Sequence, residues 1–218
     1  MRLRTAVAAV AALAALALPT TAHADPGDTV TLPVRQALAQ LPIADEDRNG
    51  YDRDNFRHWI DADKDGCNTR AEVLLEEAVV APEHTGRCTL TGGTWYSPYD
   101  DRTIDGPRGS DIDHLVPLAE AWDSGADEWT AAERQAYAND LGDSRALIAV
   151  SASSNRSKAD QDPATWMPPA EAYWCEYVTD WVAVKTRHTL SVDPSEETAL
   201  SESLSRCPNV TITATLAR

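Results

Sequence analysis

Four cysteines constrain this chain more than any other feature, because each disulfide forces two distant segments to lie side by side. They stand at Cys67, Cys88, Cys175 and Cys207. An even number of cysteines in an exported chain predicts two disulfides. Sequence order favours the pairs Cys67–Cys88 and Cys175–Cys207, although four cysteines allow three pairings. The sequence has no CxxC pair, so a zinc cluster is not expected.

The first 24 residues have the pattern of a secretory signal peptide. A short basic start precedes an apolar run over 6–18, and small residues, Ala22 and Ala24, stand at the two positions that a signal peptidase reads before the expected cleavage point after Ala24. The run is too short to span a bilayer comfortably, and no second run follows it. We therefore expect a signal peptide at 1–24 and a secreted, extracellular domain at 25–218, with no membrane segment after cleavage.

The charge of the chain bears on its partners. The formal net charge is −16, and removal of the signal peptide takes away two arginines and no acid. Proteins that hold nucleic acid tightly without sequence preference neutralise phosphates with basic residues. The acidity therefore argues against tight non-specific DNA binding, but it leaves room for a small basic site that works with bound divalent cations.

Hydrophobic spacing and turn residues predict an α+β domain. Two short strands joined by a two-glycine turn are expected at 89–91 and 94–96, and two further strands at 112–116 and 146–150. Helices are expected at 32–41, 55–60, 71–80, 118–122, 130–141 and 151–158, followed by one that contains Tyr173 to Val184 and one that begins at Asp193.

One group of residues combines the side chains that phosphodiester cleavage needs. That reaction needs a base to deprotonate water, and a divalent cation held by oxygen or imidazole ligands. Asp113 and His114 end a predicted strand and offer a carboxylate ligand beside an imidazole base. Asn155 offers an amide oxygen on the short helix that follows the next strand, and Arg156 and Lys158 flank it as candidate phosphate contacts.

Five segments in the same order resemble the secreted bacterial branch of the HNH endonuclease superfamily, and the similarity extends over roughly 52–190. They are 111–122 (DIDHLVPLAEAW), 137–140 (YAND), 147–150 (LIAV), 154–158 (SNRSK) and 162–169 (DPATWMPP). The resemblance implies a ββα-metal core, in which two strands and a helix surround one cation, most often Mg²⁺. We expect this core to be embedded in a mostly helical single domain with two disulfides.

The resemblance also assigns roles to individual residues. His114 would be the general base, and Asp113 and Asn155 would be the metal ligands. Many members of the family carry an asparagine just before the second strand, and its side chain orients the catalytic imidazole. This chain has Ala146 there. An imidazole needs a partner for its second nitrogen, so either Asn139 or a backbone carbonyl is expected to orient His114.

Residues 61–72 fit the template of a calcium-binding loop of the EF-hand type. Oxygen ligands stand at loop positions one, three, five and twelve, as Asp61, Asp63, Asp65 and Glu72, and a glycine stands at position six. Helical patterns are expected on both sides of the loop. The sequence has no second loop to pair with this one, so a polar turn secured by a disulfide is the alternative to a structural Ca²⁺ site.

These observations lead to two functional hypotheses. The first is a secreted, monomeric, metal-dependent endonuclease that cleaves DNA, with cleavage of RNA left open, and with little sequence specificity because the sequence has no base-reading module. The second is a non-catalytic secreted protein that binds calcium or a partner on a degenerate nuclease scaffold. The acidic charge and Ala146 favour the second hypothesis.

Overall fold

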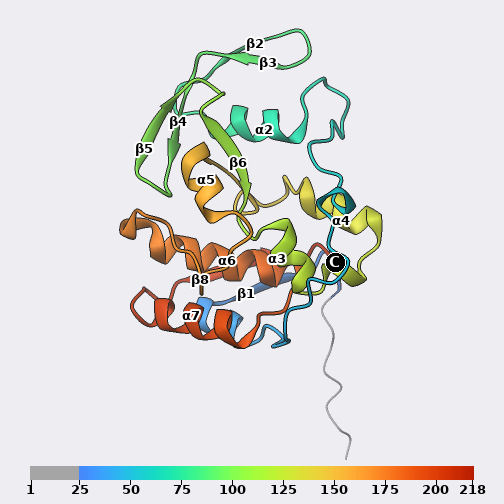
Figure 1. Ribbon diagram of the computed structural model, residues 1–218, viewed down its shortest axis with the longest axis vertical. Helices are drawn as coiled ribbons and strands as arrows, with labels where there is room; N and C mark the ends of the chain where they lie inside the picture. The colour runs from blue at the N-terminus through green and yellow to red at the C-terminus, as the bar shows by residue number, and fades with distance from the viewer. Residues whose placement is uncertain (1–24) are drawn as a thin grey trace, which may run out of the picture.

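The computed structural model describes residues 25–218, and the predicted signal peptide at 1–24 lies outside this part. Five consecutive strands stand between α2 and α3, and most of the helices come after them, an order typical of the α+β class (Figure 1). The α-helices are α1 (Val34–Leu38), α2 (Thr69–Glu76), α3 (Leu118–Asp123), α4 (Ala131–Ala138), α5 (Ala152–Lys158), α6 (Trp174–His188) and α7 (Pro194–Ser205). Three short 3-10 helices are η1 (Arg53–Asn55), η2 (Ala126–Glu128) and η3 (Glu171–Tyr173).

Within residues 25–218 the strands form four separate antiparallel pairs. The pairs are β1 (Thr29–Pro33) with β8 (Thr211–Thr215), β2 (Glu83–Thr85) with β3 (Thr89–Thr91), β4 (Thr94–Ser97) with β5 (Arg102–Asp105), and β6 (Ser110–His114) with β7 (Leu147–Ser151). In Figure 1 the β1–β8 pair lies with α6 and α7 at one end of the molecule, and β2 to β5 lie at the other. The β6–β7 pair and α5 lie between these two ends.

Helix α6 is the centre of the larger hydrophobic core. Its apolar side chains recur every three or four residues, so they form one stripe along the helix. Tyr177, Val178, Trp181 and Val182 in this stripe are all fully buried. Helices α1 and α7 and strand β8 lie against α6 and shield it from solvent. This packing makes α6 a rigid base for the rest of the fold.

A smaller core lies beneath α2 and the β6–β7 pair. Trp95 is completely buried there, and its indole Nε1 donates a 2.7 Å hydrogen bond to the Leu74 carbonyl. Ile112 of β6 and Leu147 of β7 also belong to this core, whereas Val150 of β7 packs into the larger one. Because side chains alternate along a strand, the β6–β7 pair is fixed from both faces. Packing on both faces therefore fixes the position of the β6–β7 pair.

One predicted helix and one predicted strand pairing are wrong, although both strands of that pair are present as β3 and β4. Residues 55–60 form no helix: the short turn η1 ends at Asn55, and Phe56 then enters the larger core in an extended conformation. The strands at 89–91 and 94–96 do not pair with each other, because each pairs with its other neighbour in sequence. Gly93 lies between them at φ +77°, where an added Cβ would be 2.9 Å from the Trp95 ring. Gly92 and Gly93 both adopt a positive φ, so the chain can turn sharply between the β2–β3 pair and the β4–β5 pair.

Both disulfides join cysteines that are consecutive in the sequence, the pairing that sequence order favours. Cys67 is bonded to Cys88, and Cys175 to Cys207. The first bond ties the segment before α2 to the start of β3, and the second ties α6 to the end of α7. Cross-links of this kind stabilise a fold mainly by restricting the unfolded chain.

A buried ionic group links α3, α6 and α7. The fully buried Lys185 ammonium donates to Glu120 at 2.7 Å and to Glu196 at 2.6 Å, and it also contacts the Ser124 hydroxyl and the Ser191 carbonyl. Burial alone would lower the pKa of Lys185, but the two carboxylates outweigh it and raise this pKa. The ammonium therefore stays charged inside the protein.

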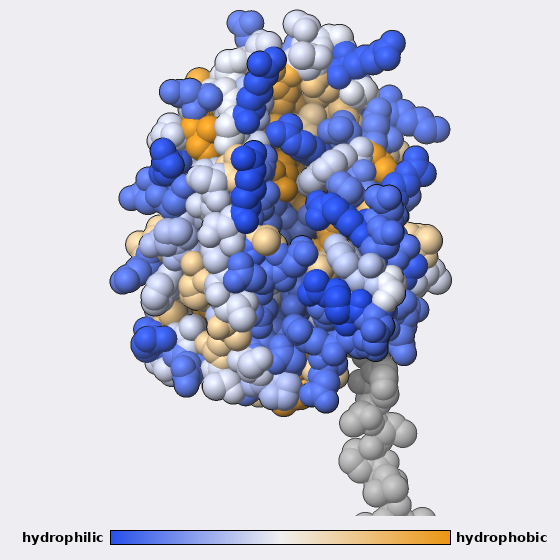
Figure 2. All heavy atoms as spheres, viewed as in Figure 1, coloured by the Kyte–Doolittle hydropathy of each residue, from blue (hydrophilic) through white to orange (hydrophobic). Residues whose placement is uncertain are grey.

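The face shown in Figure 2 is mainly hydrophilic, with small separate apolar patches. Ile43, Val79 and Leu141 are among the apolar side chains that are at least half exposed. Isolated apolar residues of this kind are normal on a protein surface. None of the helices described in residues 25–218 is long and apolar enough to cross a membrane.

Candidate functional site

A small pocket of about 130 Å³ lies where β6 ends and α5 passes beside it. The polar side chains that line it come from three parts of the sequence: Arg53, Asp113 with His114, and Asn155 with Asp160. Strand β6 provides the aspartate and the histidine, and α5 packs against both β6 and β7. Two strands and a helix thus bring together the three residues on which the nuclease hypothesis depends.

The imidazole of His114 is held in one orientation. Its Nε2 lies 3.0 Å from the backbone carbonyl oxygen of Ala138, at the end of α4. A carbonyl only accepts hydrogen bonds, so Nε2 carries the proton and the unprotonated Nδ1 is left with a free lone pair. The ring is stacked between Trp59, at 5.4 Å between ring centroids, and Tyr137, at 6.4 Å. This packing fixes the ring and its tautomer.

The same environment keeps the ring neutral. His114 is only 6% exposed, and its burial lowers its pKa to about 3. The hydrogen bond to Ala138 opposes this shift, whereas the positive charge of Arg53 adds to it. Near neutral pH the imidazole is therefore unprotonated, which is the form that a general base requires.

Asp113 is a buried carboxylate with one oxygen fully engaged. Its Oδ2 accepts hydrogen bonds from the Tyr99 hydroxyl at 2.6 Å and from the Lys158 ammonium at 2.7 Å. Burial raises the pKa of Asp113 and lowers that of Lys158, while their mutual attraction opposes both shifts. Its Oδ1 accepts no hydrogen bond from residues 25–218, so this oxygen is available to a ligand in the pocket.

Asn155 lies on α5 and faces the same pocket. Its Nδ2 donates a 3.3 Å hydrogen bond to Asp111, which stands two residues before Asp113 on β6. This contact orients the amide and leaves its Oδ1 without a protein partner among the described residues. The helix that carries Asn155 begins with a hydrogen bond from the Ser154 amide to the Ser151 hydroxyl. Such an N-cap favours the start of a helix at this point.

The prediction that Asn139 orients His114 is wrong, and the backbone carbonyl of the neighbouring Ala138 takes this role. The Asn139 side chain is occupied elsewhere. Its Oδ1 accepts from the Ile60 amide and the Thr69 hydroxyl, and its Nδ2 donates to two backbone carbonyls. Asn139 therefore secures the segment before α2 and is not part of the pocket.

The prediction that Lys158 contacts phosphate is also wrong. Its side chain is completely buried, and its ammonium donates to Asp113 and to the His114 carbonyl oxygen. It therefore holds β6 against α5 and cannot reach a substrate. Arg156 is exposed on α5 but does not line the pocket, so its contact with phosphate stays a prediction.

Sequence reasoning missed two charged residues of the pocket. Arg53 comes from η1, about sixty positions before His114, and nothing in its local sequence marks it. Asp160 follows α5 directly, so its nearness to Asn155 could have been expected. The chain turns there at Ala159, whose φ of +50° ends the helix abruptly. Together these two residues place one positive and one negative charge at the pocket.

The aspartate loop brings its first three acidic side chains together. Oxygens of Asp61, Asp63 and Asp65 lie within 4.8 Å of one another. Burial and these three carboxylates raise the pKa of Glu72, which stands in the first turn of α2. The expected helix before the loop is absent from the described chain, where 3-10 turn η1 ends at Asn55. The EF-hand template is thus matched in the loop and in its second helix.

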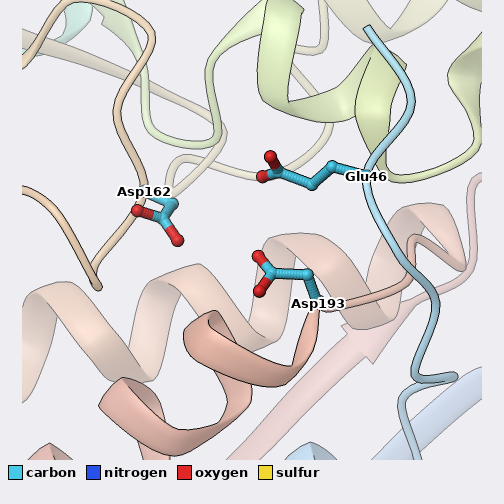
Figure 3. Close-up of side chains that lie close together, drawn as sticks. All are labelled: Glu46, Asp162 and Asp193. Atoms are coloured by element: carbon cyan, nitrogen blue, oxygen red, sulfur yellow. The ribbon is translucent and has the colours of Figure 1, made fainter.

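A second group of carboxylates, which sequence reasoning missed, joins three distant segments. Figure 3 shows Glu46, Asp162 and Asp193 pointing toward one another, and their oxygens lie within 4.8 Å. Asp193 is also the N-cap of α7 and accepts hydrogen bonds from two backbone amides. Burial and the nearby Glu120 and Asp123 raise the pKa of Glu46 to about 7. The close like charges add to the effect of burial, because ionisation of one carboxyl disfavours that of its neighbours.

The donors at the small pocket suit a hard divalent cation. Mg²⁺ keeps several waters and is commonly bound through one or two carboxylates. Asp113 Oδ1 and the Asn155 amide oxygen face the same polar pocket without competing protein donors. The Lys158 ammonium on the other oxygen of Asp113 reduces the local negative charge, so a cation there would be held weakly. The residues present therefore fit Mg²⁺ better than a metal that needs a closed cage.

Comparison with known proteins gives a family and one relative. The model of the C-terminal domain of GmrSD restriction endonucleases matches residues 69–203, a range that contains Asp113, His114 and Asn155. A protein from the fungus Arthroderma benhamiae, described as an uncharacterized secreted protein, is 39% identical over 204 residues. The alignment covers 93% of this chain and 98% of that protein. No solved structure matches the chain.

These findings bear on three parts of the sequence-based interpretation: the relation to nucleases, the bacterial branch and the location of the protein. The match to a restriction endonuclease domain agrees with a relation to nucleases, while the relative is fungal and gives no support to a bacterial branch. The secreted relative and the two disulfides confirm the predicted location, and this protein is secreted. The family model covers more than half of the chain, which therefore belongs to the family of GmrSD restriction endonuclease C-terminal domains.

Proposed function

We propose that this protein is a secreted, metal-dependent endonuclease of the HNH type that hydrolyses phosphodiester bonds in DNA with little sequence specificity. One observation carries the proposal: Asp113, His114 and Asn155 line a single polar pocket built by two antiparallel strands and the following helix. Membership in a restriction endonuclease domain family supports it independently.

His114 would activate the attacking water. Its Nε2–H is fixed by the Ala138 carbonyl, so Nδ1 is the nitrogen that accepts the proton. A divalent cation on Asp113 and Asn155 would supply positive charge to the scissile phosphate and to the leaving oxygen. Arg53 lies at the same pocket and would attract the phosphate to it, despite the acidity of the whole chain.

The direct test uses the mature protein, residues 25–218, and supercoiled plasmid. With Mg²⁺ we expect nicked and then linear DNA, cut at many positions, and with an excess of chelator we expect none. Single-stranded DNA and RNA are tested in parallel to define the substrate. A folded protein that leaves every substrate intact with Mg²⁺, Mn²⁺ and Ca²⁺ would refute the proposal, and undiminished cleavage in chelator would refute the role of a metal.

A second candidate function, calcium binding, is favoured by the aspartate loop. Three carboxylates converge there, a fourth stands in the next helix turn, and the disulfide of Cys67 pins the loop. Extracellular calcium modules bind with Kd values of about 10⁻⁴ to 10⁻³ M. We propose that the loop holds a structural Ca²⁺ of this weak class, whether or not the pocket is catalytic.

Calcium is therefore expected to stabilise the fold. At about 10 mM Ca²⁺ the melting temperature should rise by roughly 3–8 °C, because binding only to the native state stabilises a protein of this size by that amount. Differential scanning calorimetry measures the shift. Asp61→Asn should abolish it, because the template requires aspartate at loop position one, whereas Asp127→Asn, an equal charge change at an exposed site in η2, should not. The same rise in both variants would exclude the loop as the binding site.

A further inference from the structure

A second cavity lies apart from the proposed catalytic pocket and is several times larger. It has a volume of about 950 Å³ and lies between the β4–β5 pair and the first turns of α6. It shares no lining residue with the pocket at His114. A cavity of this size is in the range that holds an organic ligand.

The lining of this cavity is strongly acidic. Six carboxylates line it: Glu77, Asp100, Asp101, Glu171, Glu176 and Asp180. The single basic side chain among the described residues of the lining is Arg145, whose guanidinium is paired with Asp143 through two hydrogen bonds. The cavity therefore has a large excess of negative charge and complements a cationic ligand.

Tyr173 offers a second sign of a ligand, independent of the charges. The residue is only 8% exposed, and its hydroxyl makes no hydrogen bond within residues 25–218. Burial raises the pKa of this hydroxyl, and the carboxylates of Asp180, Glu176 and Glu77 raise it further, so the hydroxyl lies among the acids of the cavity. The hydroxyl is not one of the polar atoms sealed from solvent, so it opens into the cavity that Tyr173 lines. It is therefore free to bind whatever occupies the cavity.

The arrangement of the carboxylates does not suit a metal ion. A bound Ca²⁺ or Mg²⁺ needs oxygens that converge on one point at about 2.0–2.6 Å. Within the described chain, no three of the six carboxylates come within 4.8 Å of one another. Apolar residues, including Val79, Ile148 and Pro169, line the same cavity. The pattern fits positive charges that are spaced along a flexible apolar chain.

We propose that this cavity binds a linear aliphatic polyamine. The ammonium groups would pair with carboxylates at separate points of the wall, the methylene segments would lie on the apolar side chains, and one ammonium would donate to the Tyr173 hydroxyl. The proposal does not depend on the catalytic pocket, and it adds a ligand that a nuclease assignment does not imply.

Two buried acids of the cavity support a ligand-binding role. Burial raises the pKa of Glu77 to about 7 and that of Asp180 to about 7 as well. Glu77 receives a hydrogen bond from the Ala149 amide, and Asp180 faces Arg145 on one side and Glu176 on the other. Ionisation of a half-buried acid that has no cationic partner of its own destabilises the fold. Groups that reduce stability in this way are common at functional sites.

Isothermal titration calorimetry with spermidine tests the proposal on the mature protein at pH 8 and low ionic strength. We expect saturable binding at one site, weaker for the shorter putrescine. The double variant Glu77→Gln/Asp180→Asn should weaken binding at least about tenfold, and Tyr173→Phe severalfold. Lowering the pH to 6 should weaken binding to the wild type, because protonation of Glu77 and Asp180 removes the charges that attract the ligand.

A matched control separates the cavity from the general acidity of the chain. Asp127→Asn/Glu128→Gln removes the same two charges at exposed positions in η2 and should leave spermidine binding unchanged. The proposal would be overturned if both double variants lost binding equally, or if binding never saturated. It would also be overturned if Mg²⁺, added at a concentration that supplies as much positive charge as the spermidine, displaced the spermidine. Circular dichroism confirms that the variants remain folded.

Discussion

Substitution of His114 by alanine is expected to lower the rate of plasmid cleavage by about a hundredfold to ten-thousandfold. A general base contributes this much to catalysis, and no other imidazole lines the pocket. The assay follows the first-order loss of supercoiled plasmid at saturating Mg²⁺. Because the alanine leaves a hole between Trp59 and Tyr137, we expect a lower melting temperature as well, but a folded protein.

Two further variants separate catalysis from folding. His114→Gln fills most of the space of the ring but provides no base, so it should be as inactive as the alanine variant and more stable. His84→Ala changes an exposed histidine on β2 and should cleave at the normal rate. Added imidazole should restore part of the activity of His114→Ala. Full activity in either His114 variant would exclude the assigned base.

Substitution of Lys185 by methionine is expected to reduce the free energy of unfolding by about 3–5 kcal/mol. Removal of one member of a buried ion pair leaves the remaining charge without compensation, which costs this much. Here two buried carboxylates, Glu120 and Glu196, would lose their common partner. Urea unfolding at pH 7 measures the change as a shift of the midpoint at constant slope.

The cause of this loss can be isolated. The triple variant Lys185→Met/Glu120→Gln/Glu196→Gln carries no buried charge at this place and should regain a substantial part of the lost stability. Arg156→Met, on the exposed face of α5, should change the free energy of unfolding by less than about 0.5 kcal/mol. A triple variant as unstable as the single one would show that the packing of the lysine, and not its charge, stabilises the fold.

Local signals in the sequence predicted many of the elements. The capping box of Thr130 and Glu133 begins α4, and Asp193 followed by Pro194 begins α7, because these side chains satisfy the first free amides of a helix. The compact apolar run at 146–150 that predicts β7 is just as local. Such elements depend on residues a few positions apart, which a sequence displays directly.

Long-range pairing was not predictable in the same way. Strand β3 could pair with β2 or with β4, because a short turn that contains glycine joins it to each of them. The structure pairs β3 with β2 and leaves β4 to pair with β5, a choice that depends on packing and not on the turn residues. The same holds at the pocket. The order of Asp113, His114 and Asn155 could be recognised from sequence, but the carbonyl of Ala138 has no side chain that would identify it as the partner of the imidazole. Burial of Lys158 likewise follows only from the packing of α5 on β6.

The pairing of β1 with β8 sets the timing of folding. The hydroxyls of Thr31 and Thr213 meet across this sheet although 182 positions separate them in the chain. Strand β1 must therefore stay without its neighbour until β8 has been made, and the side of α6 that packs on β8 stays uncovered until then. Because such a distant pairing closes slowly, this end of the fold is expected to form last.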